Sequence, residues 1–219
     1  KKMADQKILG AILFEDFELL DLYGPLEMFG NIGPELKIIT IAEATGPVKS
    51  AQGPSTVAEY SFADAPSVDM VLIPGGFGTF AEAENPAMLE FVQKSGQKSE
   101  ALMSVCSGSG VLAHAGLLDG RKATSNKLFF NAITEHASNV EWLEDARWVE
   151  DGHIFTSSGV SAGTDMSLAV IAKHYGQERA EKIAVMTEYE WQSDSTADGF
   201  TQYLNQGDLS EYLELLGKT

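Results

Sequence analysis

The chain has 219 residues, 44% of them hydrophobic, which is enough for one large core. Its 15 Lys and Arg residues face 32 Asp and Glu residues, and the formal net charge of −17 excludes ready binding to nucleic acids or anionic membrane surfaces. No apolar run approaches the roughly 18 residues of a membrane span. A single cysteine excludes an intrachain disulfide and favours the cytoplasm. We expect one domain over residues 1–219, without a leader peptide.

Strand-like and helix-like segments alternate along the chain, which is typical of an α/β fold with a mostly parallel sheet. A strand is predicted over residues 7–14, a helix over 15–30 and a second strand over 36–42. A turn-rich excursion follows, and then strands over 69–76 and 100–105 flank a helix that has Pro86 in its first turn. The later elements are a short helix after residue 106, a helix over 129–137, a β-hairpin over 146–159, and helices over 162–176 and 178–191. The acidic tail after Ser193 is the only candidate for looser structure.

The only cysteine, Cys106, lies between the apolar run "ALMSV" and the glycine-rich helix start "SGSG". A side chain at such a strand-to-helix elbow is held in a tight turn at the carboxyl edge of the sheet, and Gly108 and Gly110 leave space around the sulfur. We expect the free N–H groups at the helix start to lower the pKa of the thiol below about 8.5 and to be able to hold an oxyanion. The alternative is that Cys106 is a small buried hydrophobic residue.

Two other chemistries have weaker support around the elbow. Gly108-x-Gly110-x-x-Ala113 matches a relaxed dinucleotide fingerprint, but the acid needed roughly 20 residues further on is absent from "KLFFNAI". The four histidines show neither zinc-finger nor zincin spacing, and each is expected to be solvated or to cap a helix rather than to act on the thiol. We therefore predict no cofactor and no metal site.

Four acidic residues follow the first strand, at the edge of the sheet where the elbow also emerges: Glu15, Asp16, Glu18 and Asp21. Asp21 differs from the others because apolar residues surround it in "LLDLYGP". An acid facing a thiol in a dry site has a raised pKa, stays protonated and can donate to the sulfur or to a substrate atom. The alternative is that Asp21 caps the helix that carries Pro25.

Three segments together carry a resemblance: "LLDLYGPLEMFG", "VLIPGGFG" and "SVCSGSGVLAHAGLLDGRKATS". In this order and spacing they resemble the DJ-1/PfpI superfamily, and within it the isocyanide hydratase branch. The resemblance implies a flavodoxin-like three-layer sandwich, a homodimer and a nucleophilic Cys106. It also implies that Asp21 is the acid that contacts the sulfur, and that Ser107 acts with it. An oxyanion-type pocket would use backbone N–H groups of Gly75, Gly76 and Ser107.

The chain departs from the family pattern at two positions. Asn126 stands where DJ-1 and the protease-like members have histidine, which makes protease activity improbable. Ser107 replaces the threonine that isocyanide hydratases usually carry after the cysteine. Asn126 and Val160, the latter in the loop "SSGVSAGTD", are expected to contribute to substrate binding. One branch of the family carries an AraC-type DNA-binding module, which we do not expect here.

The expected activity is hydration of isocyanides to N-formamides through an adduct on Cys106. Two alternatives remain open: a glyoxalase-like activity on small α-oxoaldehydes, and a non-catalytic sensor of oxidative stress. The expected partners are a small-molecule substrate and a second copy of the chain, with no nucleic acid and no membrane. The first helix carries more apolar residues than one buried stripe holds, so we expect it at the dimer interface. The alternative is a core helix covered on both sides.

Overall fold

A seven-stranded sheet occupies the middle of the computed structural model, which describes residues 6–218 and leaves residues 1–5 and 219 of the expected domain outside. The strand order is β10-β11-β7-β6-β1-β2-β5, and only the β10–β11 pair is antiparallel. The strands are β1 (Lys7–Ile12), β2 (Leu36–Ala42), β5 (Tyr60–Ser61), β6 (Met70–Ile73), β7 (Ala101–Val105), β10 (Trp148–Asp151) and β11 (Ile154–Ser157). The predicted α/β fold with a mostly parallel sheet is confirmed.

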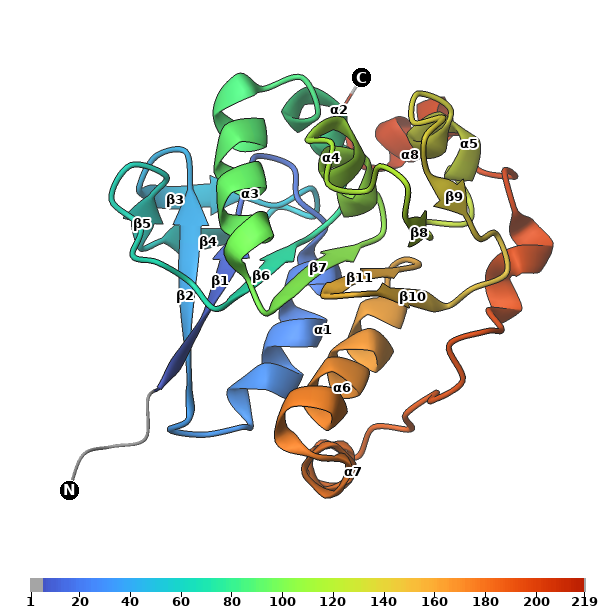
Figure 1. Cartoon of the computed structure of the whole chain (residues 1–219). Helices are drawn as coiled ribbons and strands as arrows, with labels where there is room; N and C mark the ends of the chain where they lie inside the picture. Colours follow the sequence, from blue (N-terminus) through green and yellow to red (C-terminus); the bar gives the residue numbers. More distant parts are fainter. Residues whose placement is uncertain (1–5, 219) are drawn as a thin grey trace.

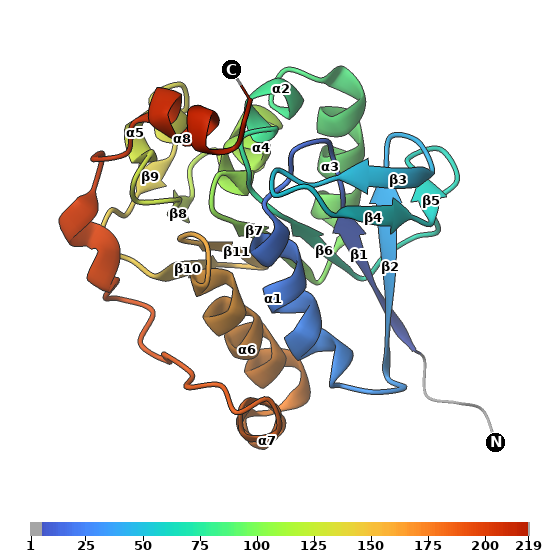
Figure 2. The ribbon, with the colours of Figure 1, turned by 180° about the vertical axis from the view of Figure 1, so that it is seen from behind.

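Helices cover both faces of this sheet, as Figures 1 and 2 show from opposite sides: α1 and α6 lie on one face, and α3 and α4 on the other. The helices are α1 (Leu19–Gly30), α2 (Thr79–Glu82), α3 (Pro86–Lys98), α4 (Gly108–His114), α5 (Phe130–Thr134), α6 (Ala162–Tyr175), α7 (Gln177–Met186), α8 (Leu209–Leu215) and the 3-10 helix η1 (Gly199–Tyr203). Two small pairs lie beside the main sheet: antiparallel β3 (Gly46–Lys49) and β4 (Ser55–Ala58), and parallel β8 (Lys122–Ala123) and β9 (Glu141–Trp142).

The central strands are apolar because helices cover them on both faces. Every residue of β6, β7 and β11 is buried, so the apolar residues of these strands do not alternate with exposed polar ones; β6 is apolar throughout, and the few polar residues of β7 and β11 are small Ser and Thr. The predicted β-hairpin is confirmed in β10 and β11. The first helix begins at Leu19 instead of residue 15, because Asp16 has a φ of +60°, a left-handed conformation that an α-helix cannot contain.

The loops that follow β1, β6, β7 and β11 meet at one edge of the sheet, since these four strands are adjacent and parallel. They carry the acidic segment, the "PGG" turn, Cys106 and the loop with Val160, respectively. Open α/β sheets place their ligands at this carboxyl edge. The topology therefore brings the predicted site segments together.

The prediction of a loosely structured tail after Ser193 is wrong. From α7 the chain runs past β10 and returns to the carboxyl edge, where α8 lies close to α4 and α5 (Figures 1 and 2). The side chains of Asp198 and Asp208 accept backbone N–H groups and start η1 and α8, respectively. Two acidic residues of this segment thus act as helix caps.

Candidate active site

Cys106 lies at the elbow between β7 and α4 with a φ of +56°, a strained conformation for a residue other than glycine. Its N–H donates to the Ser157 carbonyl at 3.2 Å, which ties the elbow to the neighbouring strand. The residue is 7% exposed and nevertheless lines a cavity. The elbow therefore places a nearly buried thiol at the wall of the cavity.

Burial, followed by the negative charge of Asp21, raises the pKa of Cys106 well above its usual range. The backbone N–H of Ser107 and the side chain of Asn126 act in the opposite direction but do not reverse the shift. The predicted lowering of the thiol pKa is therefore wrong. The N-terminus of α4, a helix of seven residues, is outweighed by the removal of the sulfur from water.

Asp21 is the third residue of α1, whose N-cap is Glu18, so the reading of Asp21 as a helix cap is wrong. Its carboxyl group is fully buried, and Oδ2 accepts the N–H of Gly75 at 2.9 Å. Oδ1 has no hydrogen-bond partner among residues 6–218. Burial, followed by the negative charge of Glu18, raises the pKa of Asp21 well above its usual range. The site therefore favours the neutral form of this carboxyl, which has one unoccupied oxygen.

Gly75 lets the acid and the thiol approach each other. A Cβ at this position would lie 2.7 Å from Asp21 Oδ2, 2.7 Å from the backbone N of Ser107 and 2.8 Å from Cys106 Cβ. Any side chain at residue 75 would therefore separate these groups.

Asn126 contacts the sulfur directly. Its Nδ2 donates to Cys106 Sγ at 3.1 Å, and its Oδ1 accepts the N–H of Phe129 at 3.0 Å, which fixes the orientation of the amide. Gly159 closes the other side of this contact, because a Cβ there would lie 2.7 Å from Asn126 Nδ2 and 2.9 Å from Cys106 Sγ. The amide that replaces the expected histidine thus supplies a hydrogen-bond donor that cannot take a proton.

The N–H groups of the "PGG" turn already have acceptors, which corrects the expectation that they form an open oxyanion pocket. The N–H of Gly75 is bonded to Asp21, and that of Gly76 donates to Ser107 Oγ at 3.0 Å. The Ser107 hydroxyl also donates to the Gly76 carbonyl at 3.0 Å, and Thr79 Oγ1 lies 2.9 Å away. The hydroxyl of Ser107 therefore holds the turn in place, since its hydrogen bonds are used within the protein.

Gly108 has a packing role that needs no bound dinucleotide. A Cβ at this position would lie 2.7 Å from the carbonyl oxygen of Ile73 and 2.8 Å from that of Pro74. The glycine thus allows α4 to begin directly against the end of β6.

A cavity of about 370 Å³ adjoins the thiol of Cys106 and the amide of Asn126. Its walls are mainly apolar and aromatic, with contributions from Phe77, Phe80, Leu128, Phe129, Ile133, Val160, Leu209, Tyr212 and Leu215. Cys106, Ser107, Gly76, Asn126 and Glu18 supply polar groups to the same lining. The described lining contains no histidine. The site thus combines a thiol, a buried acid and an amide with a pocket suited to an apolar substituent.

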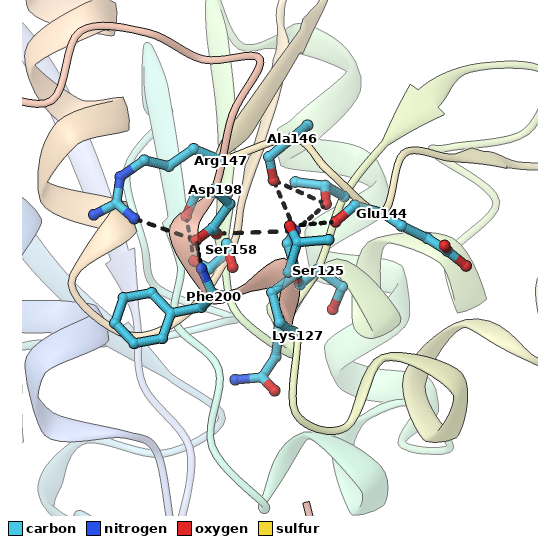
Figure 3. A network of polar contacts seen from close by, with 12 residues as sticks. Ser125, Lys127, Glu144, Ala146, Arg147, Ser158, Asp198 and Phe200 are labelled. Atoms are coloured by element: carbon cyan, nitrogen blue, oxygen red, sulfur yellow. Dashed lines mark hydrogen bonds and ion pairs between the residues drawn. The ribbon is translucent and has the colours of Figure 1, made fainter. Parts of the chain in front are cut away.

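Lys127, the next residue after Asn126, belongs to a buried polar network that Figure 3 shows. Lys127 Nζ donates to the Ala146 carbonyl at 2.7 Å and lies 4.0 Å from Asp198 Oδ2. Arg147 pairs with Asp198 at 3.7 Å and with Asp165 of α6 at 2.7 Å. Burial lowers the pKa of Lys127 to about 8, although Asp198 opposes the shift. The network joins the loop of Asn126, the segment just before β10, α6 and the carboxyl-terminal segment.

A model of the DJ-1/PfpI family matches residues 6–173. The chain belongs to the DJ-1/PfpI family. The isonitrile hydratase of Pseudomonas putida is 31% identical to this DJ-1/PfpI protein over 182 residues, which cover 83% of this chain and 78% of the hydratase. The HTH-type transcriptional regulator GbdR of Pseudomonas aeruginosa PAO1 is 30% identical, and the match covers 83% of this chain and 50% of the regulator.

Solved structures extend the comparison to the fold of this DJ-1/PfpI protein. A ThiJ/PfpI family protein from Pseudomonas syringae superposes with a TM-score of 0.78 at 30% identity, covering 97% of this chain and 88% of that one. Drosophila melanogaster DJ-1beta superposes with a TM-score of 0.74 at 21% identity, covering 85% and 100%, respectively. The second likeness supports the fold alone.

Several residues of this DJ-1/PfpI site were not singled out from the sequence. Gly159 and Tyr212 reach it from segments with no motif, and Glu18 was grouped with three other acids without a separate role. Their positions depend on contacts between distant parts of the chain. Among residues 6–218, no cluster of three His, Cys, Asp or Glu side chains suits a metal ion. No helix in that range is long and apolar enough to cross a membrane.

Proposed function

We propose that this protein hydrates isocyanides to N-formamides, with Cys106 as nucleophile and Asp21 as the acid and base. The observation that carries the proposal is the pairing of a buried carboxyl, whose pKa is raised, with the only thiol of the chain, beside a mainly apolar cavity. An isocyanide carries no ionisable group, and its carbon must receive both a nucleophile and a proton. The 31% identity to isonitrile hydratase adds support.

In the first step the sulfur of Cys106 bonds to the terminal carbon of R–NC, and that carbon receives a proton, so that the product is the thioimidate R–N=CH–S–Cys106. The thiol supplies the proton through Asp21, whose raised pKa suits it for proton transfer in both directions. Asn126 donates to the sulfur and does not compete for the proton.

In the second step Asp21 removes a proton from a water molecule, whose oxygen adds to the thioimidate carbon while the nitrogen is protonated. The C–S bond then breaks, the formamide R–NH–CHO leaves and the thiol is restored. The overall change is addition of one water to the isocyanide, with no oxidant or reductant. Ser107, Gly75 and Gly76 hold the turn that positions the acid and the sulfur, and Val160 contributes to the pocket wall.

The test is turnover of phenyl isocyanide followed by chromatography and mass spectrometry of N-phenylformamide. We expect product with the wild type, none above background with Cys106→Ala, and wild-type rates with Ser193→Ala as a remote control. Methylglyoxal and hydrogen peroxide are run in parallel. Cys106-dependent lactate without formamide would replace the proposal with a glyoxalase-like activity. A sulfinic mass shift on Cys106 without turnover of either substrate would replace it with a redox sensor.

The proposal includes a homodimer in the cytoplasm. Leu20 and Tyr23 of α1 are 49% and 45% exposed, and they form an apolar surface that a second copy would cover. The single cysteine is consistent with a reducing compartment.

A further inference from the structure

The cavity beside Cys106 is completed by a part of the chain beyond the match to the DJ-1/PfpI family, which ends at residue 173. Seven lining residues come from residues 206–215, among them Tyr212 and Leu215 of α8. The thiol, acid and amide all belong to the matched part. The reacting groups and this wall of the pocket thus come from separate parts of the chain.

The carboxyl-terminal segment is held against the site by specific contacts. The N–H of Asn205 donates to the Lys127 carbonyl at 2.9 Å, and that of Gly207 donates to the Leu128 carbonyl at 3.0 Å. A Cβ on Gly207 would lie 2.6 Å from the ring of Phe129, so the backbone lies directly against that ring. The segment therefore follows the loop that carries Asn126, and its position in the site is well defined.

Tyr212 is fixed at two points of the cavity wall. Its hydroxyl donates to Glu18 Oε2 at 2.8 Å, and its ring packs against that of Phe129 with the centroids 5.7 Å apart. The ring thus bridges two elements that are distant in sequence, the start of α1 and the loop after β8. A side chain held at both ends cannot move aside for a larger ligand without breaking these contacts.

The charged groups of the cavity are all negative. Glu18 lines it together with Asp208 and Glu211, and no Lys or Arg is present among the described lining residues. Like charges at short range in a partly dry pocket disfavour an anionic ligand.

We propose that residues 206–215, together with Glu18, select the substrate for this site: the ring of Tyr212 limits the size of the substrate, and the Glu18 carboxylate rejects anions. The inference rests on the proposed function and narrows its substrates to neutral isocyanides with one compact apolar substituent. Tyr212 and Glu18 are specificity-determining residues and take no part in bond making.

The test uses alkylation of the thiol and not turnover. Cys106 is the single cysteine, so the intact mass after alkylation reports on this site alone. Second-order rate constants are measured with iodoacetamide, with N-(1-naphthyl)iodoacetamide and with iodoacetate, and each variant is described by ratios to its own iodoacetamide rate. The ratios cancel changes in the thiolate fraction, which Glu18 itself affects.

Tyr212→Ala should raise the naphthyl ratio by about tenfold, the scale on which pockets discriminate small changes in bulk. Tyr212→Phe keeps the ring and its packing on Phe129 but loses the hydrogen bond to Glu18, so it should raise this ratio much less than Tyr212→Ala does. Tyr203→Ala removes a 44% exposed tyrosine of η1 outside the cavity lining and is the matched control. Leu215→Ala, at an 80% exposed position of the lining, should raise the ratio in a variant whose folding is not at risk. Equal naphthyl ratios in wild type, Tyr212→Ala and Leu215→Ala would overturn the size limit.

Glu18→Gln should raise the iodoacetate ratio roughly three- to tenfold, whereas Glu27→Gln, on the exposed side of α1, should not. Equal iodoacetate ratios in these two variants would overturn the rejection of anions. A protein that shows both selectivities but hydrates no isocyanide would disprove the proposed function and leave the pocket inference intact. If the protein hydrates phenyl isocyanide but the variants have the same alkylation ratios as the wild type, the proposed function stands and the pocket inference is disproved.

Discussion

The variant Gly159→Ala tests how strongly reactivity depends on the amide beside the sulfur. Gly159 is not among the residues with positive φ, so alanine fits its backbone, but the new Cβ would lie 2.7 Å from Asn126 Nδ2. Ordinary van der Waals contact begins near 3.4 Å, so the amide must retreat by about 0.7 Å. Phe129 holds the other end of the amide, and the 3.1 Å hydrogen bond to Cys106 Sγ is therefore the contact that lengthens.

The magnitude follows from the charge that the sulfur gains when it reacts. A hydrogen bond to a charged group contributes roughly 1.5–3 kcal/mol, which predicts a roughly 10- to 100-fold fall in the rate of iodoacetamide alkylation and of isocyanide hydration. The fold should survive, with a loss of about 1 kcal/mol of unfolding free energy, because the added Cβ meets only the side chains of Asn126 and Cys106 at close range.

Initial rates, thiol alkylation and urea unfolding are measured on the same preparations. Gly30→Ala is the control, because the nearest atom to its new Cβ is 4.0 Å away. In the double variant with Asn126→Ala, Gly159→Ala should cost less than it does alone, since the amide that it displaces is already gone. A folded Gly159→Ala protein with rates within about twofold of the wild type would refute the reasoning, because that loss is smaller than even one hydrogen bond provides.

Three further predictions follow from buried groups and from the exposed surface. Asp21→Asn should abolish hydration, and near-normal turnover would contradict this. The same variant should stabilise the protein at pH 7 by about 1–3 kcal/mol, because a buried carboxyl with a raised pKa destabilises the folded state once the pH exceeds the pKa of the unfolded chain. Urea unfolding at pH 4 and 7 checks the stability. Lys127→Met should lower the free energy of unfolding by about 3 kcal/mol, because Asp198 loses a cationic partner. In the wild type, the lowered pKa of Lys127 should make the free energy of unfolding rise between about pH 8 and 10.5. Equal pH slopes of this free energy in the two proteins would refute the role of Lys127. Sedimentation should show a homodimer, which added salt strengthens by screening the charge of −17 on each chain. Leu20→Glu, at an exposed position of α1, should dissociate this dimer. A wild-type monomer of 23.6 kDa at both low and high salt would exclude the dimer.

The sequence determined the sheet, the elbow and the candidate acid, because each has a local signature. Buried strands such as β6 and β7 need continuous apolar residues, and they appear as short apolar runs between turns. Cys106 was recognisable because the strand ends and small residues begin at one point, and Asp21 because apolar neighbours surround a single acid. Asn126 was found through the family pattern, at a position where a histidine was expected.

Properties that depend on contacts between distant parts of the chain could be recognised only in the tertiary structure. The thiol pKa was predicted in the wrong direction because the sequence shows the helix start but not the burial that outweighs it. The occupied N–H groups of Gly75 and Gly76 depend on partners 54 and 31 residues away. The pocket wall around Tyr212 comes from a helix of seven residues, too short to give a clear periodic pattern, which becomes part of the site only because its chain segment returns past β10 to the carboxyl edge of the sheet.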